Sequence, residues 1–161
     1  MNRVIGLVAG VATSAALFVS NGIAQPGGAS VTGNLTVDSF GNQIIVSAHQ
    51  APDGSVSGKV ILESGESGVH GQSHQRIQVD VTCVQVTGSV AIVGGTTVRS
   101  TEGVGTVHPQ YAFVLEDAGA GLPDKSTIFA LFATEPSNPC LDVFGPAVQT
   151  SVRGNIVVRG D

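Results

Sequence analysis

The chain has no tryptophan, few charged residues and no block of basic residues. Charged side chains make up 12% of the 161 residues, and Asp and Glu outnumber Lys and Arg by 12 to 7. An acidic chain of this kind repels phosphate backbones and anionic lipid, so we expect no nucleic-acid partner. The missing tryptophan removes a side chain suited to stacking on sugars, and no carboxylate pair with glycosidase spacing can be read from the sequence.

The amino-terminal segment predicts export. Residues 1–24 begin with a basic position at Arg3, continue with an apolar run of about 16 residues, and place the small residues Gly22 and Ala24 before Gln25. This order is typical of a signal peptide cleaved after Ala24. The alternative is an uncleaved anchor, but the apolar run is short for a span of about 20 residues. We therefore expect a secreted or periplasmic protein with no membrane attachment after cleavage.

The predicted mature chain, residues 25–161, is long enough for one domain with its own core. Without Arg3 it keeps 6 Lys and Arg against 12 Asp and Glu, a net charge of −6. Its only cysteines are Cys83 and Cys140, with no C-x-x-C motif. An even count in an exported protein predicts a disulfide. Closing the loop between the two cysteines would stabilise the fold by roughly 4 kcal/mol in the chain-entropy model. Two buried free thiols, or part of a metal site, remain alternatives.

Helical periodicity is absent, and short β-branched runs alternate with Gly, Pro, Asp and Asn. This pattern predicts an all-β domain with short turns, hence an antiparallel meander of about eight strands. We predict strands at residues 29–37, 42–50, 55–63, 74–86, 90–100, 110–117, 126–134 and 153–160.

Two details bear on how the sheet is shaped. In the fourth strand the inward set Ile77, Val79, Val81 and Cys83 gives way to another parity, which predicts a bulge near Cys83. The segments 31–37 and 152–158 share the pattern V-x-G-N-[LI]-x-V, which suggests that the first and last strands pair. Such pairing would make a closed or nearly closed barrel, which hides the sheet edges. A β-sandwich is the alternative.

Segments 83–95 and 114–127, read "CVQVTGSVAIVGG" and "VLEDAGAGLPDKST", resemble a loose group of uncharacterised exported bacterial all-β proteins. The shared features are a Cys-x-x-Val-x-Gly strand and turn, an Asp-x-Gly-rich loop and a terminal "GNIVV" strand. The resemblance covers roughly residues 55–158 and implies a β-barrel-like domain. It implies no activity and no catalytic residues. The chain departs from the pattern at Ala118, where an Asn is more usual.

The loop "EDAGAGLPD" poses the main functional question. Asp117 and Asp124 are weak candidates for calcium ligands, but calcium needs six to eight oxygens and the alternate positions are alanines. We expect a structural turn, in which Asp117 caps local N–H groups and Gly119 and Gly121 adopt positive φ. Asp124 is then expected to make only a local hydrogen bond.

The four histidines offer a second candidate site. His70 and His74 could share a metal ion, with His49, His108 or a carboxylate as the third ligand. A metal-assisted hydrolase using His70, His74 and an acid is therefore the alternative function, although no nucleophile motif is present. We assign no catalytic residue and no cofactor, and expect a binding or structural module. The mouth of a barrel could hold a small apolar ligand.

Overall fold

The protein is described by a computed structural model covering residues 28–37, 42–64, 75–101, 108–131, 138–141, 143, 146–147, 149–151 and 153–160. These residues form nine strands, which are β1 Ala29–Thr36, β2 Gln43–Gln50, β3 Val56–Glu63, β4 Arg76–Thr87, β5 Val90–Ser100, β6 Gln110–Glu116, β7 Lys125–Leu131, β8 Gln149–Thr150 and β9 Arg153–Gly160. All neighbours pair antiparallel in the order β8-β7-β6-β5-β4-β3-β2-β1-β9.

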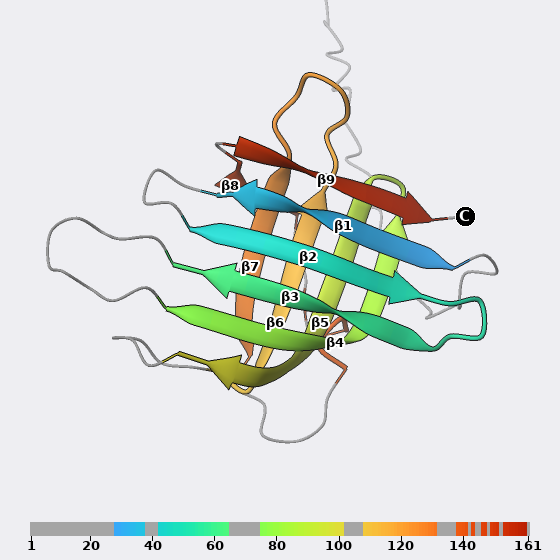
Figure 1. Ribbon diagram of the computed structural model, residues 1–161. Helices are drawn as coiled ribbons and strands as arrows, with labels where there is room; N and C mark the ends of the chain where they lie inside the picture. Colours follow the sequence, from blue (N-terminus) through green and yellow to red (C-terminus); the bar gives the residue numbers. More distant parts are fainter. Residues whose placement is uncertain are drawn as a thin grey trace, which may run out of the picture.

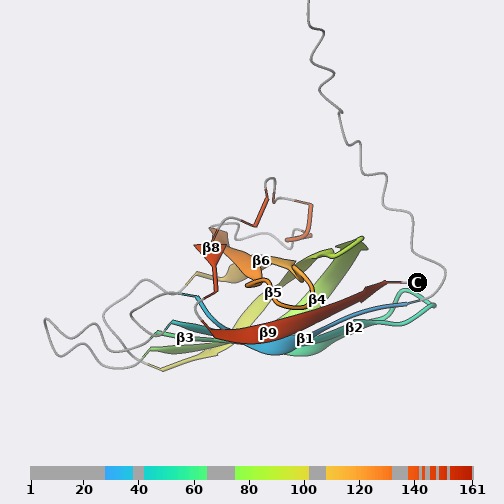
Figure 2. The same cartoon turned by 90° about the horizontal axis from the view of Figure 1, so that it is seen from above.

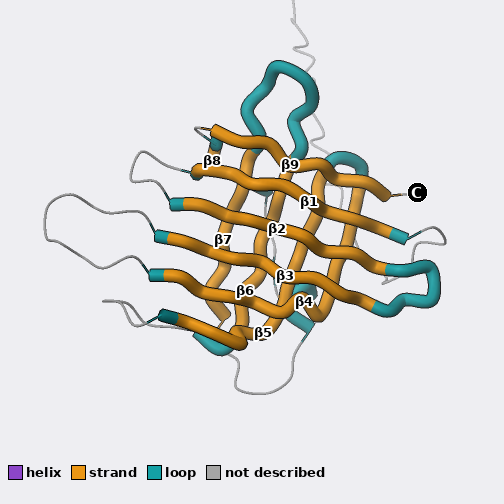
Figure 3. The backbone as a smooth tube through the Cα atoms, viewed as in Figure 1, coloured by secondary structure: helices purple, strands orange, loops and turns teal. Residues whose placement is uncertain are grey.

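The sheet curls through 236° into a nearly closed half-barrel. Figure 1 shows β9, β1, β2 and β3 running across the front, while β5, β6 and β7 cross behind them at a steep angle. The same steep crossing is clear along the backbone tube (Figure 3). Seen from above, the two groups form two layers, and β4 and β5 pass from one to the other (Figure 2). The expectation of an antiparallel meander that closes nearly into a barrel is confirmed.

The eight strands expected from the sequence are all present, with ends that differ by at most three residues. Residue 74 and residues 132–134, at the ends of two expected strands, lie outside the described residues. The sequence missed β8, because a strand of two residues carries no measurable alternation.

The space between the layers is filled by alternate side chains of nearly every strand. Val31, Ile44, Val60, Val79 and Phe113 are fully buried there. Alternation with exposed or half-buried residues, as in β2, gives each strand one inner and one outer face. The half-barrel is thus packed by its own side chains through most of its length.

Strand β6 is buried on both faces. Tyr111, Phe113 and Leu115 face the main core, whereas Ala112 and Val114 face outward and pack against Val143 and Ala147. Figure 2 shows the described pieces of residues 138–147 outside the layer that contains β5 and β6. A second, smaller hydrophobic cluster therefore lies on the convex side of the sheet.

The predicted disulfide between Cys83 and Cys140 is present and ties this covering segment to β4. Gly94 lies opposite Cys83, and a Cβ there would come within 2.8 Å of both the Cys83 sulfur and Pro139. A glycine at this position therefore allows the disulfide and Pro139 to approach the sheet closely.

The predicted bulge is also confirmed, but its consequence for Cys83 was wrong. The pairing of β4 with β5 shifts between Val81 and Cys83, so the extra residue comes before the cysteine. Val81 and Val84 both belong to the main core, while Cys83 pairs with Gly94 and reaches the covering segment outside. The bulge reverses the parity one position earlier than expected and turns Cys83 to the outer face.

The shared V-x-G-N pattern lies where β1 and β9 pair, as predicted. Asn34 is opposite Asn155, so the two segments meet almost symmetrically. A Cβ on Gly33 would collide with the carbonyl oxygen of Asn155, and a Cβ on Gly154 with that of Asn34. Each glycine thus makes room for the other segment's main chain, which is a physical reason for the repeated pattern.

Candidate functional site

The loop between β6 and β7 is a turn held by its own aspartate. Gly119 and Gly121 have φ values of 80° and 86°, as predicted. One Asp117 oxygen, Oδ1, accepts a hydrogen bond of 3.0 Å from the N–H of Gly119. The other, Oδ2, accepts one of 3.4 Å from Val158 on β9. Asp117 therefore closes the turn locally and also touches the last strand.

Asp124 has a larger role than the sequence suggested. Its side chain is buried with 1% exposure, and its two oxygens accept hydrogen bonds from different parts of the chain. Oδ1 accepts from the N–H of Ala118 at 3.0 Å, and Oδ2 accepts from the N–H of Ile156 at 2.7 Å. Its main-chain oxygen accepts from Ser151 at 2.8 Å. The expectation of a merely local hydrogen bond at Asp124 is wrong.

These contacts lie at the edge of the sheet formed by β9. Strand β9 pairs with β1 on one side, and alternate residues of an antiparallel strand direct their main-chain groups to opposite sides. On the other side of β9, where no described strand pairs with it, the N–H of Ile156 donates to Asp124 and the N–H of Val158 donates to Asp117. The acidic loop thus caps part of an edge that would otherwise be open to pairing.

The candidate metal ligands are not brought together in the described part of the chain. His70 and His74 lie outside the described residues. His49 is exposed on β2, and the ring of His108 meets Tyr111 edge to face with centroids 5.9 Å apart. Among the residues that the structure describes, no group of three or more His, Cys, Asp or Glu could hold a metal ion.

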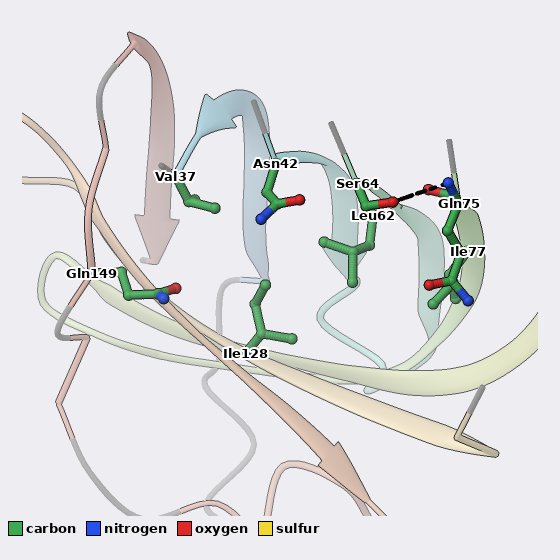
Figure 4. Close-up of a pocket in the computed structure, with 8 residues that line it drawn as sticks. All are labelled: Val37, Asn42, Leu62, Ser64, Gln75, Ile77, Ile128 and Gln149. Carbon is green, nitrogen blue, oxygen red and sulfur yellow. Dashed lines mark hydrogen bonds between the residues drawn. The ribbon is translucent and has the colours of Figure 1, made fainter. Parts of the chain in front are cut away.

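A pocket of about 180 Å³ opens between the layers at one end of the half-barrel. It lies where β1 and β3 end and where β2 and β4 begin, and β7 and β8 contribute from the other layer. Figure 4 shows Ile128 pointing toward Leu62 across this space. The described residues that line it are Val37, Asn42, Leu62, Ser64, Gln75, Ile77, Ile128 and Gln149.

Among the described residues, half of this lining is aliphatic and half is polar, and none of these eight side chains is charged. The nearest ionic residues on the rim strands, Glu63 and Arg76, occupy the opposite face and pair with each other at 3.4 Å. The pocket can therefore hold an apolar group and offer hydrogen bonds, while its described side chains give an ionic ligand no counter-charge.

Two hydrogen bonds join Ser64 and Gln75 at the rim of the pocket. The Ser64 hydroxyl accepts from the N–H of Gln75 at 2.9 Å, and the N–H of Ser64 donates to the Gln75 carbonyl at 2.8 Å (Figure 4). These bonds extend the pairing of β3 with β4 by one step beyond Glu63 and Arg76. The main chain that carries the Gln75 side chain is thereby fixed.

Sequence reasoning did not identify the pocket residues. Asn42, Ser64 and Gln75 lie just beyond strand ends, with the same parity as the inward residues Ile44, Leu62 and Ile77. Continuing the inward parity past each strand end would have found them. Gln149 carried no such signal, because β8 was not expected.

No protein-family model, no curated protein and no solved structure matches this chain. Within the described residues, no helix is long and apolar enough to span a membrane. Function is therefore inferred from the geometry of this chain.

Proposed function

We propose that the mature domain is an exported binding module that holds a small, uncharged and largely apolar ligand in the pocket at the mouth of the half-barrel. The observation that carries the proposal is the described lining of that pocket, in which four aliphatic and four uncharged polar side chains surround about 180 Å³. Concave sites with an apolar wall and a few polar groups are the usual form of small-molecule sites.

The size of the pocket limits the ligand. Typical sites for drug-sized molecules measure about 300–1,000 Å³, so this pocket suits a smaller molecule. Because a water molecule takes about 30 Å³ of liquid volume, the space corresponds to roughly six waters. A compound with six to eight non-hydrogen atoms is the scale we propose.

The alternative, a metal-assisted hydrolase, receives no support from the described residues. Asp117 and Asp124 already accept main-chain hydrogen bonds with both oxygens. His49 lies on β2 and His108 precedes β6, and neither belongs to a described group of residues that could hold a metal ion. His70 and His74, on which that alternative depends, lie outside the described residues, so it stays a prediction from the sequence.

The proposal is tested by adding benzene to isotope-labelled protein and following methyl resonances by NMR. We expect saturable shifts at Leu62, Ile77 and Ile128. Ile128→Phe should abolish the shifts by filling the pocket. The matched control is Ile61→Phe, because Ile61 is half-buried on β3 with a parity opposite to Leu62. Absence of shifts in the wild-type protein at millimolar benzene would refute the proposal.

A further inference from the structure

The side-chain nitrogen of Gln75 is a buried donor without a partner. Nε2 is closed to solvent and has no hydrogen-bond partner in the structure, and only one other described side-chain atom, Ser126 Oγ, shares this condition. Such a group carries a penalty comparable to a lost hydrogen bond, so its persistence requires an explanation. Of the two residues, Gln75 belongs to the pocket lining.

The position of the carboxamide suits it to meet a ligand. Figure 4 shows the Gln75 side chain extending beside Ile77, on the side where the pocket lies. The main chain of Gln75 is held by Ser64, whereas the terminal torsion of a glutamine is broad and soft. Rotation of the carboxamide alone can therefore bring Nε2 to an acceptor in the pocket, with little further ordering on binding.

The side chains around Gln75 limit which kind of ligand group can accept its hydrogen bond. An anionic ligand would have to leave water for a pocket where no described lining residue is a cation, and where Arg76 pairs with Glu63 on the other face. A neutral carbonyl oxygen incurs a much smaller desolvation cost and is fully compatible with an amide donor. A hydrocarbon would leave the Gln75 donor unpaired.

We propose that the ligand is a small neutral carbonyl compound, such as a ketone, ester, lactone or amide with a short aliphatic chain. Its oxygen accepts a hydrogen bond from Gln75 Nε2, and its chain packs against Leu62, Ile77 and Ile128. This inference rests on the proposed binding function and adds the hydrogen-bonding class of the ligand.

The test compares 2-hexanone with 2-methyl-1-hexene, in which a methylene group replaces the carbonyl oxygen. Both are titrated into the full mature protein and followed by NMR, through the methyl groups of Ile77 and Ile128 and the side-chain amide signals of Gln75. We expect the ketone to bind about tenfold more tightly and to shift the Gln75 amide protons downfield. Gln75→Leu should remove the preference for the ketone.

Gln78→Leu is the matched control, because Gln78 is half-buried on β4 with a parity opposite to Ile77. It should preserve the preference. Equal affinities for ketone and alkene, or a preference unchanged in Gln75→Leu, would overturn the carbonyl assignment while leaving the binding proposal intact. Failure of both compounds and of benzene to shift the pocket methyl groups would overturn the binding proposal itself.

Discussion

Asp124 accepts a 2.7 Å hydrogen bond from the main-chain N–H of Ile156, a residue 32 positions further along the chain. The bond joins the turn before β7, the second strand in the sheet order, to the outer edge of β9, which is the last strand at the opposite end. Because Asp124 also accepts from Ala118, one buried carboxylate fixes the loop conformation and the closure of the half-barrel together. We call this pair of hydrogen bonds, from Ala118 and Ile156 to Asp124, the clasp.

Asp124→Asn should lower the free energy of unfolding by about 3 kcal/mol. The asparagine would direct an NH₂ group at one of the two N–H donors, from Ala118 or Ile156, and would lose the charge that strengthens both bonds. Urea unfolding measures the change. Asp53→Asn is the control, because Asp53 is exposed and accepts a main-chain bond from nearby Ser55. Equal, small effects of the two substitutions would contradict the clasp.

Calcium should not raise the melting temperature. Both oxygens of Asp117 and of Asp124 already accept main-chain N–H groups, so calcium would compete with these donors for the carboxylate charge. A site with a dissociation constant of about 10 μM would add about 2.7 kcal/mol at 1 mM calcium, a shift of several degrees. Calorimetry with and without calcium decides this. A shift of that size that is lost in Asp124→Asn would show a metal site.

Gly154→Ala should destabilise the seam between β1 and β9 by about 3 kcal/mol. The new Cβ would meet the Asn34 main chain, in addition to the strain of an alanine at φ 99°. Gly54→Ala separates the two effects, because Gly54 has φ 83° and a Cβ added there would have no atom within 4 Å. That control should lose only about 1–2 kcal/mol. The comparison is made by urea unfolding, and equal losses would argue against the close approach.

Breaking the disulfide should uncover the outer face of β6. We expect Cys140→Ser to lower stability by about 2–5 kcal/mol and to increase binding of a hydrophobic dye, because Ala112 and Val114 lose a tethered cover. Reduction of the wild-type protein should reproduce both effects. Thiol titration of unfolded, non-reduced protein should find no free thiol, and two free thiols would disprove the bond in the native protein.

Export with cleavage after Ala24 is a prediction from the sequence. Mass spectrometry of the exported protein should show Gln25 as the first residue, in free or cyclised form. Ala24→Phe should block cleavage, because the position before the cut requires a small residue. A full-length chain recovered from the membrane fraction of wild-type cells would contradict the prediction.

The sequence by itself determined the local structure. Alternation of β-branched residues with polar ones located eight strands, and the parity change in β4 located the bulge, because both depend on neighbours along the chain. The V-x-G-N repeat predicted that β1 and β9 pair, because the glycine of each segment leaves room for the main chain of the other. The pair of cysteines was enough to predict the disulfide.

The tertiary structure decided what depends on distant segments. Whether Asp124 is solvated or buried depends on where β9 lies, because its partner Ile156 belongs to that strand. No local sequence pattern encodes the position of β9 relative to the turn. The outward turn of Cys83 depends on which residue of β4 forms the bulge. The pocket arises only where four strand ends of one layer meet β7 and β8 of the other, so its lining residues are scattered from Val37 to Gln149. Side-chain packing between layers, rather than periodicity along the chain, brings those residues together.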